Sequence, residues 1–473
     1  MAHHHEQTMR QHYLQLFVLL IGLGLWFTPT PTGLETQAWH LFAIFITTII
    51  AVIFKAMPIF TASIIGLAAV VLTGTLSAKE AYSGFSEDFI LLIIVAFLIA
   101  RGVIKSGLGK RIAFLIIRKF GKSSLGLAYS VIAADMFISP AFPSNTARSG
   151  ILFPVVNALA TDSGSKVADG TRKKLGAFLM MSSMAGITLS STLWLTAMAA
   201  NPAGAKMAEE FGVHITYASW ALAASVPIVI LFFLVPWVLY KVFPPEIKHT
   251  PEAPQIAQDA LDHMGPVHKN EWIMSAVFIG MVVLWVFSGA LGLDKTAIAF
   301  LGLGVLMVTN IFTLEDLRGE GRALATLVWF SILFAMSTYL NKLGFMGWLG
   351  GHISDGVAGL SWPIVYVSLI VGYVLIHYFF VSQTAQMLAL FSVFLGVAVE
   401  SGVPAEMMAL MLLFATNFNA IITPQGSSAN VIYVGSGYIE TGEIYKYGGI
   451  VTAVNTVVFL TIGTAWMMLL GLG

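Results

Sequence analysis

Long apolar runs separated by short polar breaks dominate the pattern of this chain. A helix needs roughly 20 mostly apolar residues to cross a hydrocarbon core of about 30 Å. Counting the broken passages, we expect roughly ten to twelve crossings and an all-α polytopic membrane protein. The clearest runs cover residues 14–27, 38–54, 59–76, 176–200, 220–242, 272–291, 363–380 and 450–472.

One long polar stretch divides this pattern into two halves. Residues 246–271 are rich in charged residues and contain three prolines, which is typical of a connector, with or without an interfacial helix. The halves on either side are residues 13–245 and 272–473. Residues 1–12 form an N-terminal tail, whose MAHHH start resembles an expression-tag remnant.

The two halves carry similar motifs at similar spacing. In the first half "IKSGL" precedes "PSNTA", and in the second half "NKLGF" precedes "VSQTA". The motif serine follows the lysine of the Lys-x-Gly turn by 39 residues in one half and by 40 in the other. The shared spacing and context predict an internal repeat.

Charge suggests how the two repeats are oriented. Residues 107–125 carry five Lys or Arg, whereas the equivalent residues 344–362 carry none. Because cytoplasmic loops are enriched in Lys and Arg, these segments are expected on opposite membrane faces. This predicts the inverted-topology repeats of many secondary transporters. The alternative is that the difference reflects only local loop chemistry.

Two apolar segments, residues 89–104 and 326–340, are shorter than comfortable spans, and each is followed by Lys-x-Gly. Re-entrant hairpins fit this pattern, because irregular backbone at membrane depth is tolerated inside protein or beside water. Ordinary tilted spans with a Gly-marked turn remain the alternative.

The Ser-x-Thr breaks are the best candidates for a binding site. A break within the membrane exposes a helix N-terminus, whose free N–H groups and partial positive charge attract anions. Two breaks could therefore form one anion site between the repeats, whereas a single break would fit a kinked helix equally well. The candidate residues are Ser144, Asn145, Thr146, Ser382, Gln383 and Thr384.

Further polar breaks follow at residues 187–202 and 419–438, and the second contains Thr423 and Pro424 in a stretch without formal charge. Two ionisable residues at depth are candidates for charge compensation. Arg148 is either a fixed cation near the site or the partner of Asp135. His377 is either a hydrogen-bonded packing residue or a functional group.

Composition narrows the function class. The chain is 57% hydrophobic and 10% charged, with a mean hydropathy of +0.85. Its formal net charge of zero argues against a nucleic-acid partner, and it has no cysteine for disulfide or thiolate chemistry. The sequence contains no GxxxxGK[ST] and no HExxH, so neither ATP-driven transport nor a metal-dependent enzyme is supported.

The paired motifs resemble the signature motifs of the divalent anion/sodium symporter family. The Lys-x-Gly turns, the break at residues 423–430 and the segment "GSGYIETGEIYKYGG" share the resemblance, which covers essentially the whole chain beyond its tail. It implies homodimeric elevator transporters of di- and tricarboxylates, with a scaffold domain and a mobile transport domain containing two hairpins. It also implies that the six motif residues hold substrate carboxylates. We add Thr423 and Pro424 to the candidate substrate site, because unwound backbone at their break would offer N–H groups to anions and carbonyls to cations.

Sodium coupling is where this sequence departs from the family pattern. Sodium-coupled members typically have SNT twice, whereas Gln383 replaces the second asparagine here, and Pro140 and Tyr378 stand four residues before the motif serines. Arg148 follows the first motif as in the branch resembling 2-oxoglutarate/malate translocators and citrate/succinate antiporters. We hypothesise that its guanidinium, with His377, replaces a transported cation.

We therefore expect a non-enzymatic, multi-pass transporter in the inner or plasma membrane, homodimeric in the lipid bilayer. It would exchange 2-oxoglutarate, malate, succinate or citrate obligatorily, without Na⁺ and without a cofactor. A Na⁺-coupled dicarboxylate symporter is the alternative within this class. An intramembrane enzyme or a channel is the alternative outside it.

Overall fold

The computed structural model describes residues 2–473, with side chains from Arg10 onward; Met1 and the first nine side chains, including the histidines of MAHHH, lie outside the described part. Throughout the described residues the named elements are helical, and one isolated bridge joins Ser123 to His249. Eleven helices are long and apolar enough to cross a membrane, within the predicted range. The all-α prediction is confirmed.

The first half consists of α1 Ala2–Phe27, α2 Thr36–Ile53, α3 Ile59–Leu72, α4 Ala78–Ala81, α5 Asp88–Ser106, α6 Leu108–Phe120, α7 Ser124–Ile138, η2 Ser139–Ala141, α8 Asn145–Asp162, α9 Gly176–Leu193, η3 Leu195–Ala197, α10 Ala200–Ala208 and α11 Tyr217–Val242. The second half consists of α13 Lys269–Leu291, α14 Lys295–Val308, α15 Leu314–Arg318, α16 Gly321–Lys342, α17 Phe345–Val357, α18 Trp362–Ile376, η5 His377–Phe379, α19 Gln383–Glu400, α20 Ala405–Phe418, η6 Ala420–Ile422, α21 Ser428–Gly435, α22 Thr441–Glu443, α23 Gly449–Val458 and α24 Thr464–Leu469.

The internal repeat predicted from the motifs is present in this order of helices. The series α2 to α10 has a counterpart for each member in the series α13 to α21, including the short 3₁₀ turns that follow α7 and α18. The lengths agree closely: α7 and α18 have 15 residues each, and α8 and α19 have 18 each. In both halves the Ser-x-Thr motif lies in the turn of a helix pair, at the start of the second helix.

Two expectations about span lengths were wrong. The segments around residues 89–104 and 326–340 are helices of 19 and 22 residues, α5 and α16, because each continues through polar residues beyond its apolar centre. Both are long enough to cross a membrane. The glycines that follow, Gly107 and Gly344, have φ of +77° and +85°, a left-handed turn that glycine adopts without strain. The expected span 176–200 is also broken, since α9 ends at Leu193.

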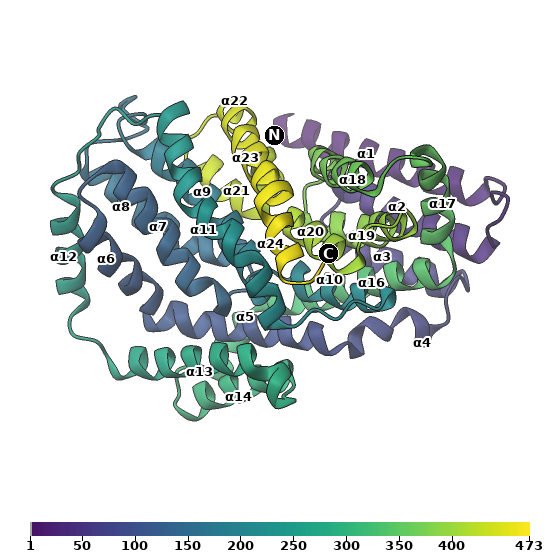
Figure 1. Cartoon of the computed structure of the whole chain (residues 1–473), viewed down its shortest axis with the longest axis horizontal. Helices are drawn as coiled ribbons and strands as arrows, with labels where there is room; N and C mark the ends of the chain where they lie inside the picture. The colour runs from purple at the N-terminus through teal and green to yellow at the C-terminus, as the bar shows by residue number, and fades with distance from the viewer. Residues whose placement is uncertain (1) are drawn as a thin grey trace.

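The polar connector contains a helix of its own, α12 Ala253–Met264, which packs along α6 at one edge of the molecule (Figure 1). The next helix, α13, begins at Lys269, slightly before the predicted end of the connector. Arg111 of α6 contacts both parts, with Nε 2.5 Å from Glu271 Oε1 and Nη1 3.1 Å from Gly265 O. The connector is therefore fixed to the first half.

The motif-bearing helices surround the most buried part of the chain. Nearly all of α9 and α20 is buried, and α8 packs on α9 while α19 packs on α20. The last helices, α23 and α24, cross the front of the molecule beside α11 (Figure 1). A second group, α2, α3, α5 and α16, packs together and faces the motif turns. The site lies where these two groups meet.

Candidate functional site

A cavity of about 600 Å³ brings the two Ser-x-Thr motifs together, although they are more than 200 residues apart in sequence. All six motif residues line it, as the sequence predicted for a shared site. On the motif side the lining residues are Pro143, Ser144, Asn145, Thr146, Met198, Ala199, Val381, Ser382, Gln383, Thr384, Ser427 and Ser428. On the facing side they are Val52, Pro58, Ile59, Phe60, Phe97, Arg322, Ala325, Thr326 and Trp329.

Four helices begin at this cavity. The residues that immediately precede α8, α10, α19 and α21 are Ser144, Ala199, Ser382 and Ser427, and each of them lines the cavity. A helix N-terminus carries roughly half an elementary positive charge and unpaired N–H groups. Among the described side chains no Asp or Glu lines the cavity, so no carboxylate in the lining offsets this positive potential. The arrangement favours anions.

The two motif serines act as helix caps in the same way. Ser144 Oγ accepts a hydrogen bond from Ala147 N, and Ser382 Oγ accepts one from Ala385 N, both at 3.2 Å. Both serines have extended backbone, with φ of −138° and −146°. These caps fix the direction in which the first N–H groups of α8 and α19 point.

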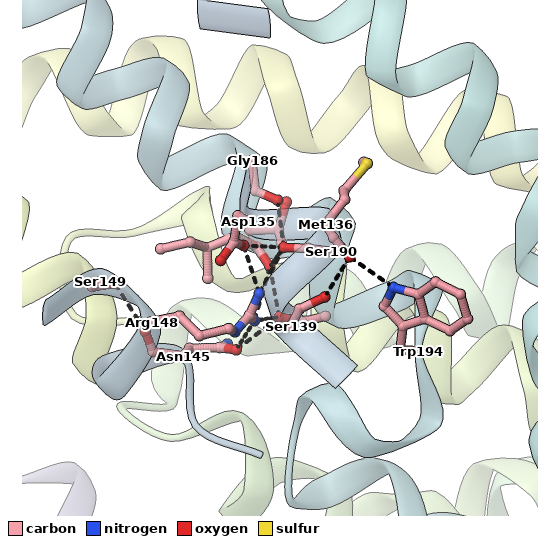
Figure 2. Close-up of polar contacts among 12 residues, drawn as sticks. Asp135, Met136, Ser139, Asn145, Arg148, Ser149, Gly186, Ser190 and Trp194 are labelled. Carbon is pink, nitrogen blue, oxygen red and sulfur yellow. Dashed lines mark hydrogen bonds and ion pairs between the residues drawn. The ribbon is translucent and has the colours of Figure 1, made fainter. Parts of the chain in front are cut away.

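Arg148 lies behind the cavity rather than in its wall. Its side chain is fully buried, and Nη1 lies 2.5 Å from Asp135 Oδ2 and 2.7 Å from Ser190 Oγ (Figure 2). Its Nη2 donates to Asn145 Oδ1 and to Ser191 Oγ, both at 2.6 Å. Arg148 therefore forms the ion pair with Asp135 that was one of the two alternatives, and it reaches the cavity only through Asn145.

These contacts determine the orientation of the Asn145 amide. Its Oδ1 accepts from Arg148 and, at 2.7 Å, from Ser191 Oγ, so its Nδ2 must be the group turned toward the other motif. That nitrogen lies 3.3 Å from Gln383 Oε1, which is long for a hydrogen bond. Asn145 thus presents donors to the centre of the site.

Gln383 is oriented in the opposite sense. Its Nε2 donates to Thr416 O at 2.7 Å and to Asn417 O at 3.2 Å. These carbonyls lie in the last turn of α20, where backbone carbonyls run short of intrahelical donors, although Asn417 O also accepts from a backbone N–H at the helix end. The amide of Gln383 therefore caps α20, and Oε1, an acceptor, is left facing Asn145. The extra methylene relative to asparagine lets one side chain reach both places.

His377 also lies outside the cavity lining, fully buried beside the polar break after η6. Its Nδ1 is 2.6 Å from Gln386 Oε1 and its Nε2 is 2.9 Å from Gly426 O. Because Gln386 Nε2 donates to Tyr373 O at 2.7 Å, Oε1 is the atom that faces the imidazole. Both ring nitrogens therefore face acceptors, and a neutral ring can donate to only one of them, while burial by itself favours that neutral ring.

Thr423 and Pro424 do not line the cavity, so the structure does not bring these two predicted residues to the motifs. Thr423 is fully buried, and its hydroxyl has no hydrogen-bond partner among the described residues. The predicted unwinding is confirmed, since η6 ends at Ile422 and α21 begins at Ser428. At this break the residues that line the cavity are those at its far end, Ser427 and Ser428.

The sequence reasoning missed Ser428 and Arg322 as lining residues. Ser428 Oγ is 2.6 Å from Thr146 Oγ1, a contact that joins the first motif to α21. Its equivalence to the start of α10 in the repeat could have identified it. Arg322 lies near the start of α16, and no motif in the sequence marks it. It is the one Lys, Arg or His among the described side chains that line the cavity.

Comparison with known proteins identifies the family. The model of the family described as "Sodium:sulfate symporter transmembrane region" matches residues 9–472. The chain belongs to this family. It is therefore a multi-pass membrane transporter and not an enzyme, and the resemblance predicted from the motifs is confirmed.

Relatives in bacteria and plants match along nearly the full length. YflS of Bacillus subtilis, whose name proposes a malate transporter, is 44% identical, with 97% of this chain and 96% of that protein aligned. Dicarboxylate transporter 1, chloroplastic, of Spinacia oleracea is 41% identical over 96% of this chain and 80% of its own length. Inner membrane protein YbhI of Escherichia coli is 33% identical, with 96% of this chain and 97% of that protein aligned.

A solved structure shares the fold. The crystal structure of the Alcanivorax borkumensis YdaH transporter aligns with a TM-score of 0.59 and covers 83% of this chain and 88% of that one. At 14% sequence identity this likeness concerns the fold alone.

Proposed function

We propose that this protein exchanges dicarboxylates across the inner membrane, with malate, succinate and 2-oxoglutarate as substrates and citrate as a larger candidate. The observation that carries the proposal is the convergence of four helix N-termini on one cavity whose lining, among the described residues, contains no acidic side chain. The names of the relatives, which concern malate and dicarboxylate transport, agree with this substrate class.

In the bound state one carboxylate lies at the N-terminus of α8 and the other at the N-terminus of α19. The backbone N–H groups of the first residues of each helix, together with the Thr146 and Thr384 hydroxyls, donate to the carboxylate oxygens. The middle of the substrate then meets the two amides, Asn145 Nδ2 and Gln383 Oε1, which are 3.3 Å apart. A hydroxyl can accept from the first and donate to the second, so the site favours a 2-hydroxy dicarboxylate such as malate.

Sodium-independent obligate exchange rests on charge. The Arg148–Asp135 pair is neutral as a unit, so the cation that replaces a transported one is the His377 imidazolium, with the helix N-termini. Without an anion the site keeps this positive potential, and moving an uncompensated charge through a bilayer is costly. The occupied site moves more easily than the empty one, which enforces exchange.

Na⁺-coupled symport is the second candidate, and one observation favours it. Three buried neutral oxygens between the end of α20 and the break after η6 lack hydrogen-bond partners among the described residues, namely Asn417 Oδ1, Asn419 Oδ1 and Thr423 Oγ1. Such oxygens suit a hard cation. His377 Nε2 and Thr423 Oγ1 crowd the same position beside Gly426, at 2.8 and 3.0 Å from where a Cβ would stand. We therefore favour the imidazolium as the cation of this region.

Transport by an elevator movement in a homodimer is part of the proposal. The motif-bearing group moves as the transport domain. The helix pairs α7–α8 and α18–α19 take the role of its two hairpins in place of the segments around residues 89–104 and 326–340, and α2, α3, α5 and α16 belong to the scaffold. The matched helix order supports two repeats, and the difference in Lys and Arg content supports their inverted orientation.

Reconstitution into liposomes tests the function. Uptake of labelled malate is measured with and without internal malate, each with and without Na⁺. Exchange predicts uptake that needs internal dicarboxylate and is unchanged by Na⁺. Uptake into empty vesicles driven by a Na⁺ gradient identifies the symporter instead, and no uptake under any of the four conditions rejects both.

A further inference from the structure

The two walls of the cavity differ in their chemistry. The motif wall offers neutral hydroxyls, amides and helix N-termini, whereas the facing wall is apolar except for Thr326 and Arg322 of α16. Arg322 is thus the single formal charge that the described lining residues contribute, and it faces the motifs from the opposite side. A dianion in this cavity lies between the four N-termini and this guanidinium.

Arg322 is directed to the cavity by the register of α16. Residues 322, 325, 326 and 329 all line the cavity, and this spacing places them on one face of the helix. Trp329 and Ala325 continue the apolar wall and Thr326 adds one neutral hydroxyl, so Arg322 is the one charge on this face of the helix, at its N-terminal end.

The guanidinium of Arg322 lacks the carboxylate partner that five other arginines have. Among the described side chains no carboxylate lies within 4 Å of it, and its nearest acidic neighbour in sequence, Glu320, contacts Arg101 at 3.6 Å. By contrast, carboxylates contact Arg101, Arg111, Arg148, Arg172 and Arg318. The charge of Arg322 is therefore free to bind an anion.

Its place in α16 is unfavourable without such an anion. Arg322 is the second residue of the helix. Glu320 immediately precedes the helix and contacts Arg101 at 3.6 Å, while the first turn itself contains no Asp or Glu. A cation at a helix N-terminus is repelled by the helix dipole, where an acidic residue is normally preferred. A carboxylate bound here would relieve that repulsion and gain a charge-assisted hydrogen bond.

We propose that Arg322 is a wall-side substrate ligand that selects for dianions. The helix N-termini bind each carboxylate from the motif wall, and Arg322 donates to a carboxylate oxygen that is turned away from that wall. A monocarboxylate bound at the motifs has no second carboxylate that could accept a hydrogen bond from Arg322. The inference rests on the proposed dicarboxylate transport, and it adds the residue that distinguishes two negative charges from one.

The test is exchange by the full chain in liposomes, with Arg322→Gln and the control Arg318→Gln. Arg318 lies one helix earlier, contacts Glu315 at 2.8 Å and does not line the cavity. The apparent KM for malate, and inhibition by succinate and by the four-carbon monocarboxylate butyrate, are measured at low and high ionic strength.

Arg322→Gln is expected to raise the KM for malate about tenfold, as loss of one charge-assisted contact in a partly solvated site should. It should also narrow the preference for succinate over butyrate and weaken the dependence of KM on salt. Arg322→Lys keeps the charge and should stay within about threefold of wild type. Arg318→Gln should match wild type.

An unchanged KM and an unchanged succinate preference in Arg322→Gln overturn the inference, as does an equal change in Arg318→Gln. If Arg322→Gln cannot be recovered as a folded protein, the test is how the KM for malate depends on ionic strength in wild type and in Arg322→Lys. A KM that does not change with salt in either protein overturns the inference. Failure of the proposed function is a different result, because wild type itself would then show no exchange.

Discussion

The opposed amides of Asn145 and Gln383 predict that this transporter distinguishes malate from succinate. The two molecules differ by one hydroxyl, and the site has a donor and an acceptor 3.3 Å apart where that hydroxyl would lie. The gain is about one neutral hydrogen bond, roughly 0.5–1.5 kcal/mol. Since about 1.4 kcal/mol corresponds to tenfold in affinity, malate should bind roughly two- to twelvefold more tightly than succinate.

Gln383→Met is the perturbation that isolates this effect. Methionine keeps the length of the side chain and most of its volume but replaces the amide acceptor with a weakly accepting sulfur. The variant also removes the donor to Thr416 O and Asn417 O, so we expect a loss of stability of about 1 kcal/mol. The ratio of the affinity for malate to the affinity for succinate should fall to about one in this variant.

The assay is competition by malate and by succinate against exchange of labelled 2-oxoglutarate. Thr384→Val serves as the control, because it removes a hydroxyl from the same helix start and should weaken both inhibitors equally. A wild-type protein that binds succinate as tightly as malate refutes the reasoning. So does a Gln383→Met variant that retains the wild-type preference.

Three further predictions concern the buried charges and one surface pair. Arg148→Ala should lower the free energy of unfolding by about 3–5 kcal/mol, because it leaves Asp135 buried and unpaired. The double change Arg148→Met with Asp135→Leu should recover most of that stability but not the affinity for substrate. Thermal melting in detergent measures the stability and exchange assays measure the affinity; a single variant as stable as wild type contradicts the pairing. His377→Gln retains a donor for the facing carbonyl but not the charge, so the KM for malate should rise about tenfold, and an unchanged KM removes the imidazolium from the mechanism. The Lys105 ammonium donates to Asp316 at 2.7 Å and holds the pKa of that carboxyl at about 2. The pair therefore stabilises the fold at pH values above the ordinary carboxyl pKa, and this contribution is lost as the pH falls toward 2. Asp316→Asn should therefore lower stability by less than about 1 kcal/mol near neutral pH, with a difference that shrinks in acid; a difference in melting temperature that does not change with pH would count against this assignment.

Local features of the chain determined the larger outlines of this protein. Continuous apolar runs predict spans because backbone groups in lipid must pair within the helix, and eleven such helices are present. The two Ser-x-Thr breaks predict helix starts because serine accepts from the N–H groups of the first turn, which Ser144 and Ser382 do. These are short-range effects, so the sequence sufficed for the fold class, the repeat and the motif half of the site.

The lengths of the segments near the Lys-x-Gly turns were misjudged for an equally physical reason. Apolar content alone marks where a helix is buried, not where it ends. Both α5 and α16 continue into polar residues, and they stop where Gly107 and Gly344 adopt left-handed backbone. The length of each helix is therefore set by the left-handed glycine at its C-terminal end and not by the end of its apolar segment.

Only the tertiary structure decided which groups face the substrate. Arg148 looks like a site cation in sequence, but Asp135, Ser190 and Ser191 surround its guanidinium, and it acts by orienting Asn145. The acceptor face of Gln383 depends on carbonyls that end α20, more than 30 residues away. Arg322 enters the cavity because α16 packs opposite the motif turns. Orientation of an amide and pairing of a charge depend on partners that distant segments supply, and no local pattern in this sequence specifies those partners.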